Sequence, residues 1–71
     1  MTVTHTFRVE GMRCGGCGLL VDDAVEDLPG VRTSTTSVRA GRTVVEAGAE
    51  VDPGRIAAAI TAAGYPATRV A

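Results

Sequence analysis

Residues 3–30 read VTHTFRVEGMRCGGCGLLVDDAVEDLPG, and this stretch decides the fold. Val3, His5, Phe7 and Val9 alternate with polar residues, and this period of two is typical of a β-strand. The glycines within residues 11–16 then predict a flexible loop. From Cys17 to Leu28 the apolar residues recur at helical spacing, and Pro29 with Gly30 ends that helix. The residues expected on its inner face are Leu20, Val21, Ala24, Val25 and Leu28.

A hairpin is predicted next. Val31–Val38 is rich in β-branched residues, residues 39–42 form a natural turn, and a further strand is expected around Thr43–Ala47. The first of these strands is unusually polar, so we expect a domain of modest stability. Whichever of its faces is buried, a pair of hydroxyl residues lines the core where valine would pack better: Ser34 and Thr36, or Thr33 and Thr35.

A second helix and a short last strand complete the chain. Asp52 followed by Pro53 is typical of a helix start, because a carboxylate caps the first turn and proline fits it. Gly64 ends this helix, and Tyr65–Val70 can add a strand. The order β-α-β-β-α-β predicts an α+β, ferredoxin-like fold in which a four-stranded antiparallel sheet carries two helices on one face. No linker or repeat interrupts the chain, so we expect one domain over residues 1–71.

Size and charge argue against several classes of function. The 71 residues carry seven arginines and eight carboxylates, for a net charge of −1, whereas a nucleic-acid binder needs a basic surface. One phenylalanine and one tyrosine offer no platform for stacking bases. A chain of this length uses nearly all of its residues to form its core and leaves few to line a catalytic pocket. We therefore expect a binding module and not an enzyme. The sequence shows no signal peptide and no apolar run that could cross a bilayer, which predicts a cytoplasmic protein without membrane insertion.

Cys14 and Cys17 form a C-x-x-C pair on the loop that enters the first helix. The glycines between them remove side chains that would hinder the two sulfurs from facing one point. Cys17 lies at the helix start, where unpaired N–H groups and the helix dipole favour a thiolate. Thiolate pairs select soft ions such as Cu(I), which accepts two ligands, whereas structural zinc wants four. His5 is expected at the surface or edge of its strand and not at the metal.

Four short motifs carry a family resemblance: GMRCGGC at residues 11–17, LPGV after the first helix, VDP before the second and AAGY near the end. With these motifs the chain resembles the heavy-metal-associated domain family, which includes small copper chaperones and the N-terminal domains of copper-transporting P-type ATPases. The resemblance implies that Cys14 and Cys17 bind Cu(I). It also implies that Met12 packs inward and shapes the loop without binding metal, and that Tyr65 lies beside the metal.

The chain departs from the family pattern beside each cysteine. Arg13 stands where the family usually has threonine, serine or histidine. An aspartate there would add an oxygen ligand for a divalent ion, whereas arginine only offsets the negative charge of a bis-thiolate copper centre, which favours copper. Gly18 replaces a better helix former, so we expect a loss of up to roughly 1 kcal/mol of helix stability and a mobile first turn.

Four carboxylates gather on the first helix, and no arginine lies between Cys14 and Val31 to balance them: Asp22, Asp23, Glu26 and Asp27. A solvated helix face is one interpretation. Because members of the family meet their partners through this helix and the metal loop, the resemblance favours a second one. In that interpretation the carboxylates are a docking patch for a basic partner surface.

The function expected from these features is a cytoplasmic Cu(I) metallochaperone. It would transfer copper by ligand exchange to a copper-transporting P-type ATPase or to the soluble metal-binding domain of one, and two copies could share copper in a homodimer. Three alternatives stay open. The chain could be the N-terminal metal-binding domain of an ATPase, although a start at methionine and an end after the last strand favour a free-standing protein. It could instead bind mercury or another soft ion, or be a small thiol redox protein.

Overall fold

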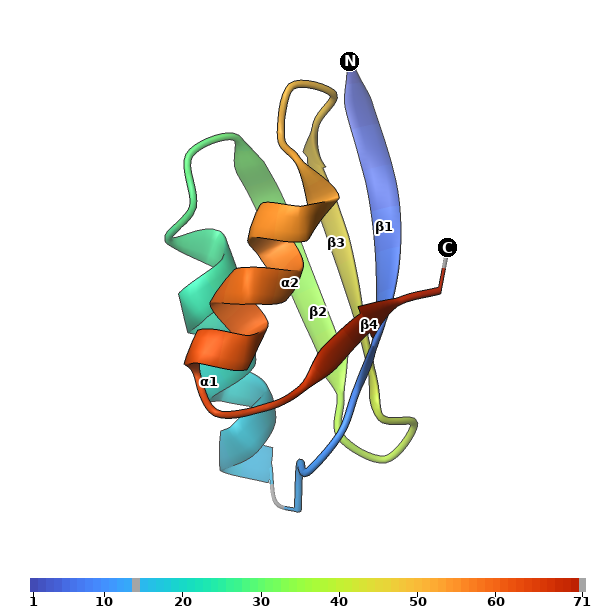
Figure 1. Cartoon of the computed structure of the whole chain (residues 1–71), viewed down its shortest axis with the longest axis vertical. Coiled ribbons are helices and arrows are strands. Elements are labelled where there is room, and N and C mark those ends of the chain that lie inside the picture. The colour runs from blue at the N-terminus through green and yellow to red at the C-terminus, as the bar shows by residue number, and fades with distance from the viewer. Residues whose placement is uncertain (14, 71) are drawn as a thin grey trace.

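The computed structural model describes residues 1–13 and 15–70, and its elements follow the predicted order (Figure 1). The four strands form one sheet in the order β2-β3-β1-β4, with every neighbouring pair antiparallel. Both helices cover the same face of that sheet (Figure 1), so the predicted ferredoxin-like fold is confirmed. The elements are β1 (Thr2–Val9), α1 (Gly15–Glu26), β2 (Val31–Ser37), β3 (Arg42–Gly48), α2 (Pro53–Ala62) and β4 (Ala67–Arg69).

The boundaries of the second helix and of the last strand have local causes. Asp52 caps α2 as predicted, since its carboxylate accepts a hydrogen bond of 2.8 Å from the backbone N–H of Gly54. Gly64 has a φ of 106°, a left-handed conformation that turns the chain away after the helix. β4 is shorter than the predicted Tyr65–Val70 and begins only after Pro66, which has no N–H to donate to a neighbouring strand.

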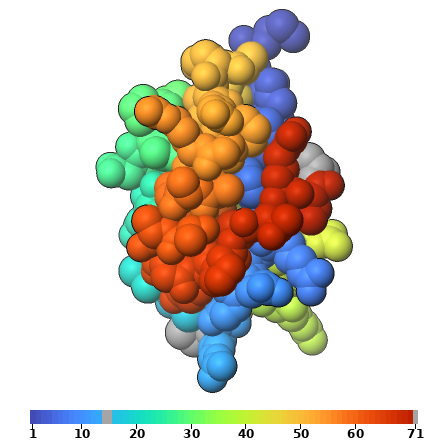
Figure 2. Space-filling view, in the orientation of Figure 1, coloured from blue at the N-terminus to red at the C-terminus, as the bar shows by residue number. Residues whose placement is uncertain are grey.

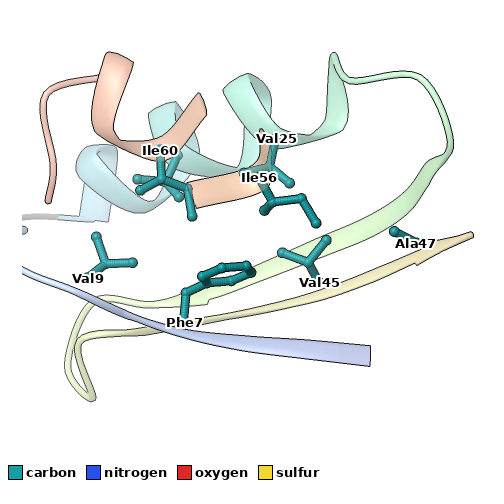
Figure 3. Close-up of a cluster of buried hydrophobic side chains, with 8 residues drawn as sticks. Phe7, Val9, Val25, Val45, Ala47, Ile56 and Ile60 are labelled. Atoms are coloured by element: carbon teal, nitrogen blue, oxygen red, sulfur yellow. The ribbon is translucent and has the colours of Figure 1, made fainter. Parts of the chain in front are cut away.

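The core lies between the two helices and the sheet (Figure 3). Phe7, Val9, Val45 and Ala47 point from the strands toward residues of α1 and α2. The buried helix residues that meet them are Val21, Val25, Ile56 and Ile60. The alternation seen in the sequence of β1 therefore marks the face that the helices cover.

His5 belongs to that buried face, so its expected place at the strand surface is wrong. Only 6% of the residue is exposed, and within the described residues its Nδ1 atom has no hydrogen-bond partner. His5 has the same parity along β1 as Phe7 and Val9, so its side chain lies on the face of the sheet that the helices cover.

The polar strand β2 turns Ser34 and Thr36 toward α1. Ser34 is buried and Thr36 is half-buried, while Thr33 and Thr35 are exposed on the open face of the sheet. Both inward hydroxyls donate to Asp22 of α1, at 2.7 and 2.6 Å. On this part of β2, hydrogen bonds to a carboxylate therefore take the place of the apolar packing that valine side chains would provide.

Candidate metal centre

One pole of the molecule gathers three connections of the chain. The backbone N–H of Val9 donates to the carbonyl of Gly41 at 2.8 Å, and that of Glu10 donates to Pro66 at 3.0 Å. The β1–α1 loop is thereby tied to the β2–β3 turn and to the α2–β4 connection. Residues 10–13 and the β2–β3 turn project at this end, which is the lower end in Figure 2. Gly11 bends the loop with a φ of 85°, a left-handed conformation that glycine adopts readily.

Cys17 is half-buried in the first turn of α1. The helix begins at Gly15, so Cys17 lies in the first turn, at the positive end of the helix dipole. The first turn of α1 contains no acidic residue that would compete with a thiolate for this positive end. The geometry therefore favours an anionic sulfur at Cys17. Cys14 lies outside the described residues, so the geometry of the C-x-x-C pair stays a prediction.

Of the three residues expected around the cysteines, Met12 and Tyr65 pack against the core and Arg13 is exposed. Met12 is half-buried and packs against the hydrophobic core, as the inward position requires. Tyr65 also packs against the core, and a Cβ added to Gly11 would lie 3.8 Å from its Cδ1, so the ring lies against the metal loop. Arg13 is exposed. The fold thus brings Tyr65 to the loop, while contact with a metal stays a prediction.

The four carboxylates expected on the first helix do not form one solvated face, and α1 ends at Glu26, before Asp27. Asp22 is half-buried and binds the hydroxyls of β2, and Glu26 accepts a hydrogen bond of 3.1 Å from the backbone N–H of Ser34. Asp23 and Asp27 are exposed. Among the described residues, the side chains of Asp22 and Glu26 in the predicted docking patch are engaged within the domain, whereas those of Asp23 and Asp27 are exposed. The spacing of Asp22 and Glu26, one helical turn apart opposite a hydroxyl-rich strand, is the signal that the sequence interpretation missed.

Two leucines beside Cys17 are exposed. Leu19 is 68% exposed and Leu20 is 57% exposed, so placing Leu20 on the inner face of the helix is wrong. Gly18 is buried against β2, and Val21 and Val25 face the core. With these residues turned inward, the helical period directs Leu20 toward solvent, away from β2 and from the core. The surface next to Cys17 is therefore apolar.

The described parts of the chain show two further properties. Within residues 1–13 and 15–70, no three His, Cys, Asp or Glu residues are grouped so that they could hold a metal ion. None of the helices in this range has both the length and the hydrophobicity of a membrane-spanning segment.

Comparison with known proteins places this loop and fold in a family. The family model of the heavy-metal-associated domain matches residues 6–66. The chain belongs to the heavy-metal-associated domain family. A copper binding domain from HMA7, a P-type ATPase, superposes on this domain with a TM-score of 0.94 and 26% identity, covering 100% of this chain and 96% of that one.

Two relatives of this heavy-metal-associated domain are named for different functions. The copper chaperone CopZ of Staphylococcus saprophyticus is 42% identical over 43 residues, which is 61% of this chain and 63% of CopZ. The mercuric reductase of Shigella flexneri is 33% identical over 63 residues, which is 89% of this chain but 11% of the reductase. The domain likewise spans only 7–9% of the copper-transporting ATPases that it matches. The likeness to the reductase and to the ATPases is therefore one of a single domain.

The buried position of Gly18 leads to a prediction about stability. A Cβ at this position would lie 3.1 Å from Cγ2 of Val38 and 3.4 Å from Cγ2 of Thr36. Gly18→Val places two further methyl groups in that contact, so we expect it to lower the free energy of unfolding by about 1–3 kcal/mol. Gly18→Ala is expected to change it little, since the tight contact is offset by a gain of about 1 kcal/mol in helix propensity. Urea unfolding followed by circular dichroism measures both, and a valine variant as stable as wild type would contradict the packing described.

Proposed function

We propose that this domain is a Cu(I) metallochaperone in which Cys14 and Cys17 bind one copper ion as thiolates. The observation that carries the proposal is the C-x-x-C motif whose second cysteine lies in the first turn of α1, at the pole where three connections meet. Relatives named as a copper chaperone and as a copper binding domain of a P-type ATPase support copper as the cargo. Two thiolates suit this ion, because Cu(I) is soft and accepts low coordination.

Transfer would proceed by ligand exchange at the exposed pole. A thiolate of the partner adds to the copper, which gives a three-coordinate ion, and one sulfur of the chaperone then leaves and takes a proton from solvent. One Cu–S bond forms as another breaks, so the oxidation state of copper does not change. Low coordination keeps this exchange fast although the affinity is high. Arg13, exposed next to Cys14 in the sequence, would offset the negative charge of the bis-thiolate centre.

The surface around the loop fits a docking role. Leu19 and Leu20 offer apolar contact near Cys17, and the exposed carboxylates of Asp23 and Asp27 lie further along α1 and just after its end. Charge complementarity of this kind speeds encounter with a basic partner and adds specificity. We propose a copper-transporting P-type ATPase, or its soluble metal-binding domain, as that partner. The same loop could also join two copies of the chain through a shared copper ion.

The setting of the domain is part of the proposal. We propose that residues 1–71 form a single, non-enzymatic domain that acts in the cytoplasm. A metal-binding domain within a larger transporter is the nearest alternative, because several relatives contain this domain as a small part of a long chain. The chemistry of the thiolate pair would be the same in both cases.

Mercury is a second candidate cargo. The match to a segment of a mercuric reductase favours it, and a thiolate pair binds this soft ion as well. Arg13 does not discriminate between the two ions, since it supplies no ligand to either. The choice between copper and mercury therefore needs a direct comparison of binding.

The test is an anaerobic titration of the fully reduced protein with Cu(I) against a competing chelator, followed by Hg(II) and Zn(II). We expect one tightly held Cu(I) per chain, or one per dimer if sedimentation shows association on loading. Zinc is expected to bind weakly, because the two cysteines provide only half of its usual ligands. If Cu(I) fails to outcompete the chelator while mercury or zinc binds, the copper proposal is wrong.

A further inference from the structure

A strip of polar contacts joins α1 to β2. Gly18, Asp22 and Glu26 are spaced one helical turn apart, so they lie along one side of α1. Asp22 accepts from the hydroxyls of Ser34 and Thr36, and Glu26 accepts from the backbone N–H of Ser34. Gly18 brings the helix backbone close to the methyl group of Thr36. The side of α1 toward β2 is therefore held largely by directional contacts.

Two hydrogen bonds of the Thr36 hydroxyl link Thr43 on β3 to Asp22 on α1. Its hydroxyl donates to Oδ1 of Asp22 at 2.6 Å, and its oxygen lies 3.0 Å from the hydroxyl of Thr43, which is fully buried. A threonine hydroxyl has a single proton, and Thr36 gives it to Asp22, so Thr43 must donate to Thr36. Thr43 on β3 is thereby connected to the middle of α1 through one side chain. A hydrogen bond depends on angle as well as distance, so this chain of bonds resists sliding of the helix along the sheet.

Thr36 contacts α1 at a second point. Its Cγ2 would be 3.4 Å from a Cβ at Gly18, which is the residue next to Cys17 in the first turn. The hydroxyl of Thr36 thus restrains the axial position of α1 at Asp22, and its methyl group, with Cγ2 of Val38, limits how closely the helix approaches the sheet at Gly18. The position of Cys17 relative to the loop follows from both contacts.

We propose that Thr36 is a positioning residue for the thiolate site, acting through Asp22 and Gly18 on the first turn of α1. The proposal rests on the metal-binding function proposed above. A helix turn held in the binding geometry does not have to be ordered when the metal arrives. Loosening it lowers the apparent affinity in proportion to the fraction of molecules that are competent to bind.

The decisive comparison is Thr36→Val against Thr35→Val. Both variants exchange a hydroxyl for a methyl group on the same strand, but Thr35 is exposed on the open face of the sheet. Thr36→Val keeps a methyl group toward Gly18 and removes both hydroxyl contacts, so we expect Cu(I) affinity to fall about three- to tenfold. Thr35→Val is expected to bind as wild type does. Thr36→Ser retains the hydroxyl and is expected to recover most of the affinity.

Amide hydrogen exchange of the metal-free protein supplies a readout that does not depend on copper. The N–H groups of residues 19–21 close the first turns of α1, and we expect them to exchange faster in Thr36→Val than in Thr35→Val, well below the unfolding temperature. A purely structural role would lower the unfolding temperature of Thr36→Val and speed exchange at residues 19–21 no more than in the rest of α1, and it would leave the Cu(I) affinity unchanged. That result would overturn the proposal. If Thr36→Val does not fold, Asp22→Ala takes its place, since it removes the oxygen that accepts both hydroxyl bonds and leaves Thr36 unchanged.

These measurements separate the two proposals. A wild-type protein that holds no Cu(I) would contradict the metallochaperone function. The exchange rates would still decide the role of Thr36 in ordering the first turn, and equal rates in the two valine variants would refute it. A wild-type protein that binds Cu(I), together with equal affinity in both valine variants, would leave the function standing and remove Thr36 from it.

Discussion

Cys17→Ser is expected to lower Cu(I) affinity on the order of a thousandfold, or about 4 kcal/mol. Serine keeps the size of the side chain in the first turn of α1, but its hydroxyl does not ionise at neutral pH and is a poor ligand for a soft ion. Cys17 is half-buried and outside the hydrophobic core, so the fold should persist. Competition with a chromophoric chelator under anaerobic conditions measures the affinity, and circular dichroism checks the fold.

Arg13→Ala is the matched control for this experiment. Arg13 is exposed in the same loop and provides no metal ligand, so its loss removes only a compensating charge. We expect an affinity within about tenfold of wild type, since an exposed charge contributes little in water. A Cys17→Ser protein that binds Cu(I) as tightly as the Arg13→Ala protein would show that the cysteine pair is not the binding site.

Phe7→Ala is expected to unfold much of the population at physiological temperature. Phe7 is fully buried between β1 and the helices, and removal of such a ring costs about 3–5 kcal/mol. A domain of 71 residues has a total stability of roughly 4–11 kcal/mol. The unfolding temperature should therefore fall by about 12–40 °C, at about 4–8 °C per kcal/mol for a domain of this size.

Val44→Ala controls for the loss of apolar side chain from the sheet. Val44 lies on β3 but faces the open side, where it is 40% exposed. Thermal unfolding followed by circular dichroism is expected to show a change of less than about 1 kcal/mol for this variant. If the two variants melt within a few degrees of each other, Phe7 does not contribute the packing described here.

The parts of the fold that depend on local pattern could be predicted from the sequence. The alternation in β1, the proline and glycine after α1 and the Asp52 cap of α2 each arise from neighbouring residues, and the structure contains all of them. The position of Cys17 at the start of α1 follows in the same way. A short-range signal was enough to place the candidate site at the β1–α1 junction.

What the sequence interpretation missed depends on contacts between distant elements. The periodicity of α1 does not reveal that Asp22 faces a hydroxyl strand, because Ser34 and Thr36 are brought to it by the fold. His5 is buried because it shares the face of β1 that the helices cover, and the helices reach that face only in the folded domain. Leu20 is exposed because the close approach of Gly18 to β2 sets the rotation of the helix.

The polarity of β2 also bears on aggregation. β2 is an edge strand, since it pairs with β3 alone, and an edge presents unpaired N–H and C=O groups to any other chain. Aggregation-prone segments combine β-propensity with high hydrophobicity and low net charge, whereas β2 reads VRTSTTS, with an arginine and five hydroxyl residues. Its inward hydroxyls find partners within the domain, and its outward ones stay hydrated. The polar residues that replace valine in β2 therefore also disfavour pairing of this edge with strands of other chains.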